Sequence, residues 1–260
     1  MALDSDFHSH IVRSSPAQMI QSAHEKGIRI LGLSEHVFQM HEARSPLKHM
    51  PLEGPMLTIP DYFAAVKAAS EQAPIDVRVG LEVDFVPGKN EAIQQPLQGH
   101  PWDFLIGSVH EVDGQQFEQK RPLSREEGQQ RWLRYYELLR EAVNSGYFSL
   151  ISHPIRMRTA NPYIPDTLDD ELQHLAAEAT RNNVALEING YDLRSYPTLV
   201  RRLAVACATQ HTPISVGSDA HNPTQVAQSH KATASLLHDL GISRVRIWRQ
   251  MEPEEYDIRL

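Results

Sequence analysis

The stretch Val79-Gly-Leu-Glu-Val-Asp-Phe85 has the apolar character of a buried β-strand, yet it carries two carboxylates near its carboxyl end, Glu82 and Asp84. An unpaired carboxylate in such a strand costs roughly several kcal/mol of desolvation. Glu82 therefore needs a cation, and its two oxygens can bridge two metal ions about 3.5 to 4 Å apart. A salt-bridged core glutamate is the alternative interpretation of Glu82 taken alone. Asp84 points to the same side and is expected to support the ligands from behind.

Six other segments of the chain end in the same way. In each, a residue that can bind a metal or polarise a substrate comes at the end of an apolar, strand-like run. These residues are His8-Ser-His10, Glu35-His36, His110, His153, Glu187 with Asn189, and Asp219-Ala-His221. In a parallel α/β barrel, all strands open their carboxyl ends onto one face, so ligands far apart in sequence can converge on one site.

Strand-like and helical segments alternate along the whole chain, as βα units require. Seven strands are expected at residues 3–7, 28–33, 77–85, 104–109, 148–152, 184–188 and 214–217, with an extra strand at 245–248. Ser15 with Gln18 and Ser124 with Glu127 resemble helix-capping pairs, and later helices are expected at residues 169–182, 196–210 and 223–240. No linker divides the chain, so we predict a single α/β domain over residues 1–260.

Residues 37–59 form a long segment rich in Pro, Met and His without a clear period. By its length, such a segment is either a functional lid or disordered. Because it follows His36 directly, at the face where the ligands gather, we favour a lid.

Composition narrows the functional classes. The net charge of -8 argues against a nucleic-acid partner, because phosphate backbones require a basic surface. No apolar run approaches the roughly 20 residues of a membrane helix, and the N-terminus lacks the pattern of a signal peptide. We therefore expect a cytoplasmic protein with no membrane partner. The only cysteine, Cys207, lies in an apolar stretch, which excludes an internal disulfide and a cysteine zinc cluster.

The histidine motifs have the spacing that metal chelation needs. His8 and His10 share one side of an extended chain, because residues two apart face the same way, and Asp219 with His221 repeats that spacing. His110 and His153 each follow an apolar run, and neutral imidazole binds zinc, iron and manganese. Any one of these histidines alone would be read as a surface or hydrogen-bonded residue.

In combination, these motifs resemble the polymerase and histidinol phosphatase (PHP) superfamily, and within it most closely the stand-alone histidinol-phosphate phosphatases. The motifs that carry the resemblance are His8-Ser-His10, Ser34-Glu-His36, Gly80-Leu-Glu82, Gly107-Ser-Val-His110, Ser152-His153 and Gly217-Ser-Asp-Ala-His221. The resemblance implies a distorted (β/α)7 TIM-like barrel with a trinuclear metal site. It agrees with the seven strand ends found above.

The resemblance also implies a ligand set of two or three divalent ions, zinc, manganese or iron. The first ion would take His8, His10, Glu82 and Asp219, the second Glu82, His110 and His153, and the third His36 and His221. The family usually has one more histidine after the first pair, but this chain reads Ile11-Val-Arg-Ser-Ser-Pro16 there. The third ion is then weak, absent, completed by water or phosphate, or bound by His41 or His49 from the lid.

Phosphate monoester hydrolysis has a very high barrier, which clustered cations lower by generating hydroxide and neutralising charge. The predicted catalytic residues are Glu82, Asp219, His221, Arg156 and Arg158. The two arginines could clamp phosphoryl oxygens, or they could be solvated loop charges. Further candidates for substrate binding are Arg13, Glu187 and Asn189, of which the last two could equally hydrogen-bond the ligands or have a structural role.

We therefore expect a metal-dependent phosphatase acting on a small phosphate ester, with L-histidinol phosphate preferred on the strength of the resemblance. A cationic substrate would suit an acidic mouth formed by Glu35, Glu42, Glu53 and Asp84. The alternatives are a phosphodiesterase or nuclease of the same superfamily, a phosphatase for another small ester, and a non-catalytic module that binds metal or phosphate. The sequence leaves the oligomeric state open.

Overall fold

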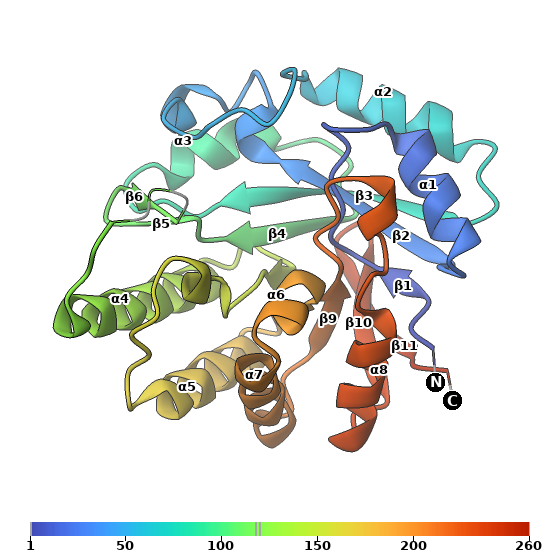
Figure 1. The fold of residues 1–260 in the computed structure, drawn as a ribbon. Coiled ribbons are helices and arrows are strands. Elements are labelled where there is room, and N and C mark those ends of the chain that lie inside the picture. Colours follow the sequence, from blue (N-terminus) through green and yellow to red (C-terminus); the bar gives the residue numbers. More distant parts are fainter. Residues whose placement is uncertain (1, 118, 120, 260) are drawn as a thin grey trace.

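The computed structural model describes residues 2–117, 119 and 121–259. Its centre is a sheet of seven parallel strands that follow one another in chain order (Figure 1). These strands are β1 (Ser5–Asp6), β2 (Ile30–His36), β3 (Asp76–Asp84), β4 (Phe104–Ser108), β7 (Leu150–Ile151), β8 (Ala185–Asn189) and β9 (Ile214–Gly217). The predicted single-domain (β/α)7 barrel is confirmed, and the bounds of β9 match the prediction.

Contacts between the first and last strands close the sheet into a barrel. The Phe7 amide donates to the Val216 carbonyl at 2.9 Å, and the His10 amide donates to the Ala220 carbonyl at 2.7 Å. A parallel bridge joins Ser9 to Ala220. The two motifs with alternating ligands therefore lie side by side although they stand at opposite ends of the sequence.

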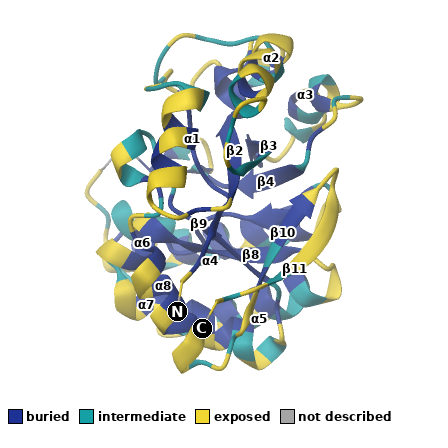
Figure 2. Ribbon diagram, turned by 90° about the vertical axis from the view of Figure 1, so that its right-hand side faces the viewer, coloured by how far each residue is buried: buried dark blue, intermediate teal, exposed yellow. Residues whose placement is uncertain are grey.

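The helices pack around the outside of the barrel, and their outward faces are exposed while the barrel strands are largely buried (Figure 2). They are α1 (Pro16–Glu25), α2 (Ile59–Ser70), α3 (Asn90–Gln94), α4 (Arg125–Asn144), α5 (Leu168–Arg181), α6 (Gly190–Ser195), α7 (Pro197–Gln210) and α8 (His230–Asp239). Ser15 accepts from the Gln18 amide at the start of α1, and Ser124 forms the full capping box with Glu127. Among the described residues, no helix combines the length and apolar character that crossing a bilayer requires.

The predicted helix at 223–240 begins too early. Residues Pro223–Gln225 form a short 3-10 turn, and α8 starts only at His230. Ala227 has a φ of 55°, which an α-helix does not accommodate, and its amide donates to the Asp6 carboxylate at 3.0 Å. A contact with a residue more than two hundred positions away therefore overrides the local helical signal.

Several elements differ from the predicted limits or were not predicted. Strand β1 is shorter than residues 3–7, and β2 runs on to His36, so Glu35 and His36 belong to the strand. Elements without a clear sequence signal are α2, α3, α6, the hairpin of β5 (Glu111–Val112) and β6 (Gln115–Gln116), and β11 (Glu252–Asp257). Short elements of this kind depend on tertiary packing more than on periodicity.

A C-terminal hairpin covers the end of the barrel opposite the strand carboxyl ends. The extra strand predicted at 245–248 is confirmed as β10 (Arg244–Arg249), which pairs antiparallel with the exposed β11 (Figure 2). Trp248 packs on Phe7 and Phe104, with ring centroids 5.8 Å and 6.4 Å apart. Aromatic side chains thus fill the end of the barrel that the hairpin covers. The polar candidate ligands lie at the other end, where the strands have their carboxyl ends.

The Phe104 ring fits inside the barrel only because two neighbouring strands carry glycine there. A Cβ atom on Gly32 or Gly80 would overlap the ring of Phe104. We expect Gly80→Ala to lower the free energy of unfolding by about 1–3 kcal/mol through overpacking. Urea denaturation measures this loss. The double variant Gly80→Ala/Phe104→Leu should recover part of it, and equal losses in the single and double variants would contradict the explanation.

Residues 37–59 are packed, which argues against the disordered alternative for this segment. The segment contains two 3-10 turns, Val37–Gln39 and Ser45–Leu47, and Met40 bridges Leu57. The side chains of Val37, Met40 and Leu47 are fully buried. The role of the segment as a lid stays a prediction.

Candidate metal centre

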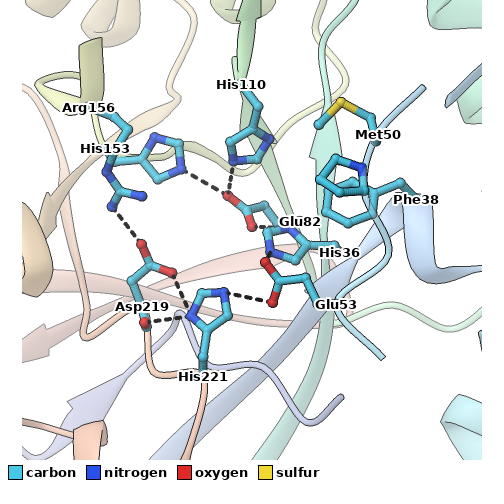
Figure 3. Close-up of a pocket in the computed structure, with 11 residues that line it drawn as sticks. His36, Phe38, Met50, Glu53, Glu82, His110, His153, Arg156, Asp219 and His221 are labelled. Carbon is cyan, nitrogen blue, oxygen red and sulfur yellow. Dashed lines mark hydrogen bonds and ion pairs between the residues drawn. The ribbon is translucent and has the colours of Figure 1, made fainter. Parts of the chain in front are cut away.

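The predicted ligands converge at the carboxyl ends of the strands, with Glu82 of β3 in their midst (Figure 3). Its Oε2 lies 2.7 Å from His36 Nδ1 and 3.3 Å from His8 Nε2. Its Oε1 lies 3.0 Å from His153 Nε2 and 3.4 Å from His110 Nε2. One carboxylate therefore faces imidazoles from several different strand ends, which is the arrangement that bridging two cations needs.

Three groups of side chains have ligand atoms close enough to hold a metal ion. Within each group, one ligand atom of each residue lies within 4.8 Å of the others. They are His8 with His10 and Glu82, His36 with Glu82 and His110, and His10 with His36 and His221. The first group contains three of the four residues predicted for the first ion and lacks Asp219. The second contains His36 where the prediction has His153. His36 is therefore a member of both the second and the third group.

Unsatisfied polar atoms in the buried cluster provide a test of whether metal ions fit. The nitrogens His8 Nε2, His10 Nε2 and His36 Nδ1, together with Glu82 Oε2, are buried and make no acceptable hydrogen bond among the described residues. A native structure rarely leaves buried polar atoms unpaired, because each costs about 1–3 kcal/mol. Imidazole and carboxylate donors suit zinc, manganese and iron, so the residues fit such ions.

Carboxylates behind the ligands orient the imidazole rings. Glu187 Oε1 lies 2.8 Å from His8 Nδ1, and Asp84 Oδ1 lies 2.8 Å from His110 Nδ1. Glu187 also accepts from the His153 amide through Oε2 at 2.8 Å. Carboxylates paired with the far nitrogen of a ligand histidine fix the ring and raise its basicity. Glu187 thus contacts ligand residues, which is one of the two roles predicted for it.

Three of the histidines carry raised pKa values. Burial alone would lower the pKa of His8, but Glu187, Glu82 and Asp219 raise it well above its usual range. Burial also opposes protonation of His10, yet its contacts with Asp219 and Glu35 raise the pKa to about 9. For His110, burial is again outweighed, here by Asp84 and Glu82, and the pKa rises well above normal. Divalent cations would take the place of these protons.

Four other groups of the cluster have lowered pKa values. Burial would raise the pKa of Glu82, but the surrounding histidines hold it well below normal, and Arg156 with His8 does the same for Asp219. Burial together with Arg156 lowers the pKa of His153 to about 3. Burial and the neighbouring His10 lower that of His221 to about 4. The carboxylates are therefore ionised, and these two imidazoles are neutral, as metal ligands must be.

A pocket opens beside Glu82 and the histidines around it, and of the three predicted arginines Arg156 lines this pocket. Its Nε donates to Asp192 at 2.8 Å, and its Nη2 donates to Asp219 at 2.6 Å and to Asn189 Oδ1 at 3.1 Å. These bonds fix the guanidinium beside Asp219. Asn189, a predicted substrate-binding residue, thus holds Arg156 and also caps α6.

The other two arginines lie farther out. Arg158 stacks over the Tyr196 ring at 5.3 Å and is not among the residues that line the pocket. Arg13 is 55% exposed and pairs with Glu53, with Nη2 3.3 Å from Oε2. Sequence position alone did not distinguish these arginines from Arg156.

Segment 37–59 forms one wall of the pocket. Phe38, Met50, Pro51 and Glu53 line it beside the candidate ligands, and the Phe38 ring stacks on His36 with ring centroids 4.5 Å apart. Glu53 was named from the sequence as part of the acidic mouth. The three apolar wall residues were not predicted, because an irregular segment has no periodicity that would mark an inward face. Ser108, which donates to Glu82 Oε1 at 2.7 Å, was likewise missed.

The suggested loop ligands and most of the acidic mouth lie elsewhere. His49 Nε2 is 2.6 Å from Glu111, and His41 is exposed, so the structure brings neither to the histidine cluster. Glu42 accepts from the Ile59 amide at 3.0 Å. Glu35 and Asp84 are buried behind the ligands, which leaves Glu53 as the glutamate of the proposed mouth that lines the pocket.

Glu35 holds the chain that follows the first histidine pair. Its Oε2 accepts from the amides of Ile11 and Val12 at 2.9 and 2.8 Å, and its Oε1 accepts from the His36 amide at 2.9 Å. We expect Glu35→Gln to weaken metal binding by about 10- to 100-fold and to lower the free energy of unfolding by about 1–3 kcal/mol. The reason is that the NH2 group of the glutamine side chain would face a backbone N–H donor.

Zinc titration and urea denaturation measure the two effects. Glu42→Gln serves as the control, because it removes a nearby carboxylate that contacts no ligand. Unchanged zinc affinity in Glu35→Gln would show that the backbone contacts do not support the site.

Comparison with known proteins gives a family match and relatives that span the chain. The PHP domain family matches residues 5–190. A probable histidinol-phosphatase of Deinococcus radiodurans is 28% identical, covering 96% of this chain and 98% of its own. A histidinol-phosphatase of Lactococcus lactis subsp. lactis is 30% identical over 42% of this chain and 39% of its own.

Among solved structures, the fold is similar to that of histidinol phosphate phosphatase from Lactococcus lactis subsp. lactis. The TM-score is 0.75 at 21% sequence identity, with 96% of this chain and 98% of the other covered. That crystal structure contains zinc, L-histidinol and phosphate.

Proposed function

The chain belongs to the PHP domain family, and on this premise we propose that it is a metal-dependent phosphatase that converts L-histidinol phosphate to L-histidinol and phosphate. The observation that carries the proposal is Glu82, which faces His8 Nε2 and His36 Nδ1, two buried nitrogens that make no acceptable hydrogen bond among the described residues. The Deinococcus radiodurans relative, named a probable histidinol-phosphatase, supports the substrate because the two chains match over nearly their full lengths.

The proposed ligands are His8, His10, His36, Glu82, His110, His153, Asp219 and His221. Two or three zinc, manganese or iron ions held there would supply a hydroxide near neutral pH and neutralise charge on the phosphoryl group. Glu82 is placed to serve two ions at once, since its two oxygens face different histidines. Asp219 faces His8 and His10 through Oδ1 and Arg156 through Oδ2.

Arg156 is the proposed phosphate-binding residue of the chain. Asp192 and Asp219 engage its Nε and Nη2. Among the described residues, this leaves Nη1 for a phosphoryl oxygen of the substrate. A planar guanidinium held in this way loses little side-chain entropy when it binds a phosphate oxygen. Its positive charge also stabilises the charge that builds up in the transition state.

The wall formed by segment 37–59 supports a substrate with a ring. Phe38, Met50 and Pro51 add apolar side chains to the pocket lining, and Figure 3 shows Phe38 and Met50 across the pocket from Arg156. An imidazole ring bound against this wall would place an attached phosphate toward Arg156. The apolar wall gives a purely ionic substrate, such as inorganic pyrophosphate, little to contact.

The test is phosphate release by the purified chain, stripped of metal and reloaded with zinc, manganese or iron. We expect the highest kcat/KM for L-histidinol phosphate against a panel of sugar phosphates, nucleotides and a phosphodiester. Preference for another monoester would reject the substrate, and preference for the diester would favour a phosphodiesterase. Bound metal without hydrolysis of any ester would favour a binding module.

A further inference from the structure

Segment 37–59 places one carboxylate, Glu53, against the histidines of the third group. Figure 3 shows Glu53 between His36 and His221. Its Oε2 lies 3.3 Å from His221 Nε2, and its Oε1 lies 3.8 Å from His36 Nε2. The side chain is only 20% exposed, and Oε2 is buried without an acceptable hydrogen bond among the described residues.

The imidazoles that face Glu53 are themselves packed closely together. The ring of His10 lies 4.2 Å from that of His36 and 4.3 Å from that of His221, and both of its nitrogens are buried without a hydrogen bond among the described residues. Ligand atoms around an ion with bonds of about 2.0–2.2 Å stand roughly 3–3.5 Å apart in tetrahedral geometry. The spacing of Glu53 to His221 already lies in that range, and the spacing to His36 is slightly wider.

Glu53 also has the chemistry that the third group lacks. His10, His36 and His221 offer only nitrogen donors, and a carboxylate would add the negative charge that a divalent cation favours. Residues 11–16 contain no histidine or acidic residue. His49, the other candidate from this segment, is paired with Glu111.

We propose that Glu53 completes a third metal site with His10, His36 and His221, so that the third ion ties segment 37–59 to the barrel. This inference rests on the proposed metal-dependent function and concerns the same pocket. Arg13 is the rival partner of Glu53, at 3.3 Å, but its side chain is 55% exposed. An exposed ion pair contributes only about 0–1 kcal/mol, so a divalent cation displaces it readily.

Ligation through Glu53 would reach the rest of the segment through its backbone. The Glu53 amide donates to Gln39 Oε1 at 3.3 Å, and the neighbouring chain bridges from Met40 to Leu57. Fixing the Glu53 side chain at the barrel face therefore restrains the two stretches of the segment that this bridge joins. Occupancy of the third site should slow amide hydrogen exchange within residues 37–59.

The first experiment counts metal ions in the full-length chain. Wild type and Glu53→Gln are stripped, titrated with zinc, and analysed for bound metal by mass spectrometry. We expect three ions in wild type and two in Glu53→Gln, or a third ion bound at least about 10-fold more weakly. The two retained ions show that the variant is folded. Glu42→Gln, on the same segment but bonded to Ile59, should keep three.

Hydrogen exchange and a second variant sharpen the test. Zinc should protect residues 37–59 in wild type and much less in Glu53→Gln. Arg13→Ala should keep the third ion, since it removes only the rival of the metal. An unchanged third ion in Glu53→Gln, or equal counts of two in both proteins, would overturn the inference. These readouts need no substrate, so three ions held through Glu53 without phosphate release would reject only the proposed function.

Discussion

Glu82→Gln is expected to lower kcat/KM for phosphate release by about 10⁴-fold or more. The Glu82 side chain is 1% exposed and faces His36 at 2.7 Å and His153 at 3.0 Å through different oxygens. Glutamine keeps the shape but loses the negative charge and one acceptor oxygen. Each 1.4 kcal/mol of lost transition-state stabilisation costs about tenfold in rate, and metal ions supply several such increments.

The measurement combines steady-state kinetics with a count of bound metal at each zinc concentration. Glu91→Gln, the same change at an exposed position of α3, should behave as wild type. Retention of activity within about tenfold of wild type by Glu82→Gln would contradict the bridging role of this carboxylate. Loss of activity with full metal content would place its role in the reaction and not in metal binding.

Stripping the metal ions is expected to lower Tm by at least about 15 °C. The unfolded chain cannot assemble ligands from separate strand ends, so metal binding stabilises the folded state. An ion present at about 1,000 times its Kd contributes roughly 4 kcal/mol, so the two ions beside Glu82 alone contribute about 8 kcal/mol. For a chain of this size, about 2 °C of Tm corresponds to each kcal/mol.

Calorimetry before and after chelation, and again after zinc is restored, measures this difference. Glu82→Gln is the internal control, because a chain with a broken bridging site should gain much less Tm from zinc. Equal zinc-dependent shifts in wild type and Glu82→Gln would show that the stabilisation comes from other sites. A shift below about 3 °C would correspond to roughly 1–2 kcal/mol and to weak ligation.

The barrel was predictable because each βα unit carries its own local signals. An apolar run marks each buried strand, and β9 at Ile214–Gly217 agrees with the prediction residue by residue. Ser124 and Glu127 cap α4 as their spacing predicts. Local sequence signals gave the wrong helix start where a distant contact sets the backbone conformation. At Ala227 the amide donates to Asp6, and α8 begins only after this residue.

The site was predictable to the extent that it depends on strand ends. Glu82, His110 and His153 meet because parallel strands present their carboxyl ends together. Irregular segments carry no such rule, so Glu53 was predicted only as part of an acidic mouth and not as a neighbour of His221 and His36. Its neighbours in sequence gave no period from which an inward face could be inferred.

By itself, the sequence determined the barrel and the candidate ligands that stand at its strand ends, because strand formation and the residue at each strand end are local properties. Only the tertiary structure decided which ligands lie close enough to share an ion, and that Arg156 lines the pocket while Arg158 does not. It also decided that Glu53 lies beside His221. These distances follow from barrel closure between β1 and β9 and from the packing of segment 37–59, and both join residues that are far apart in the chain.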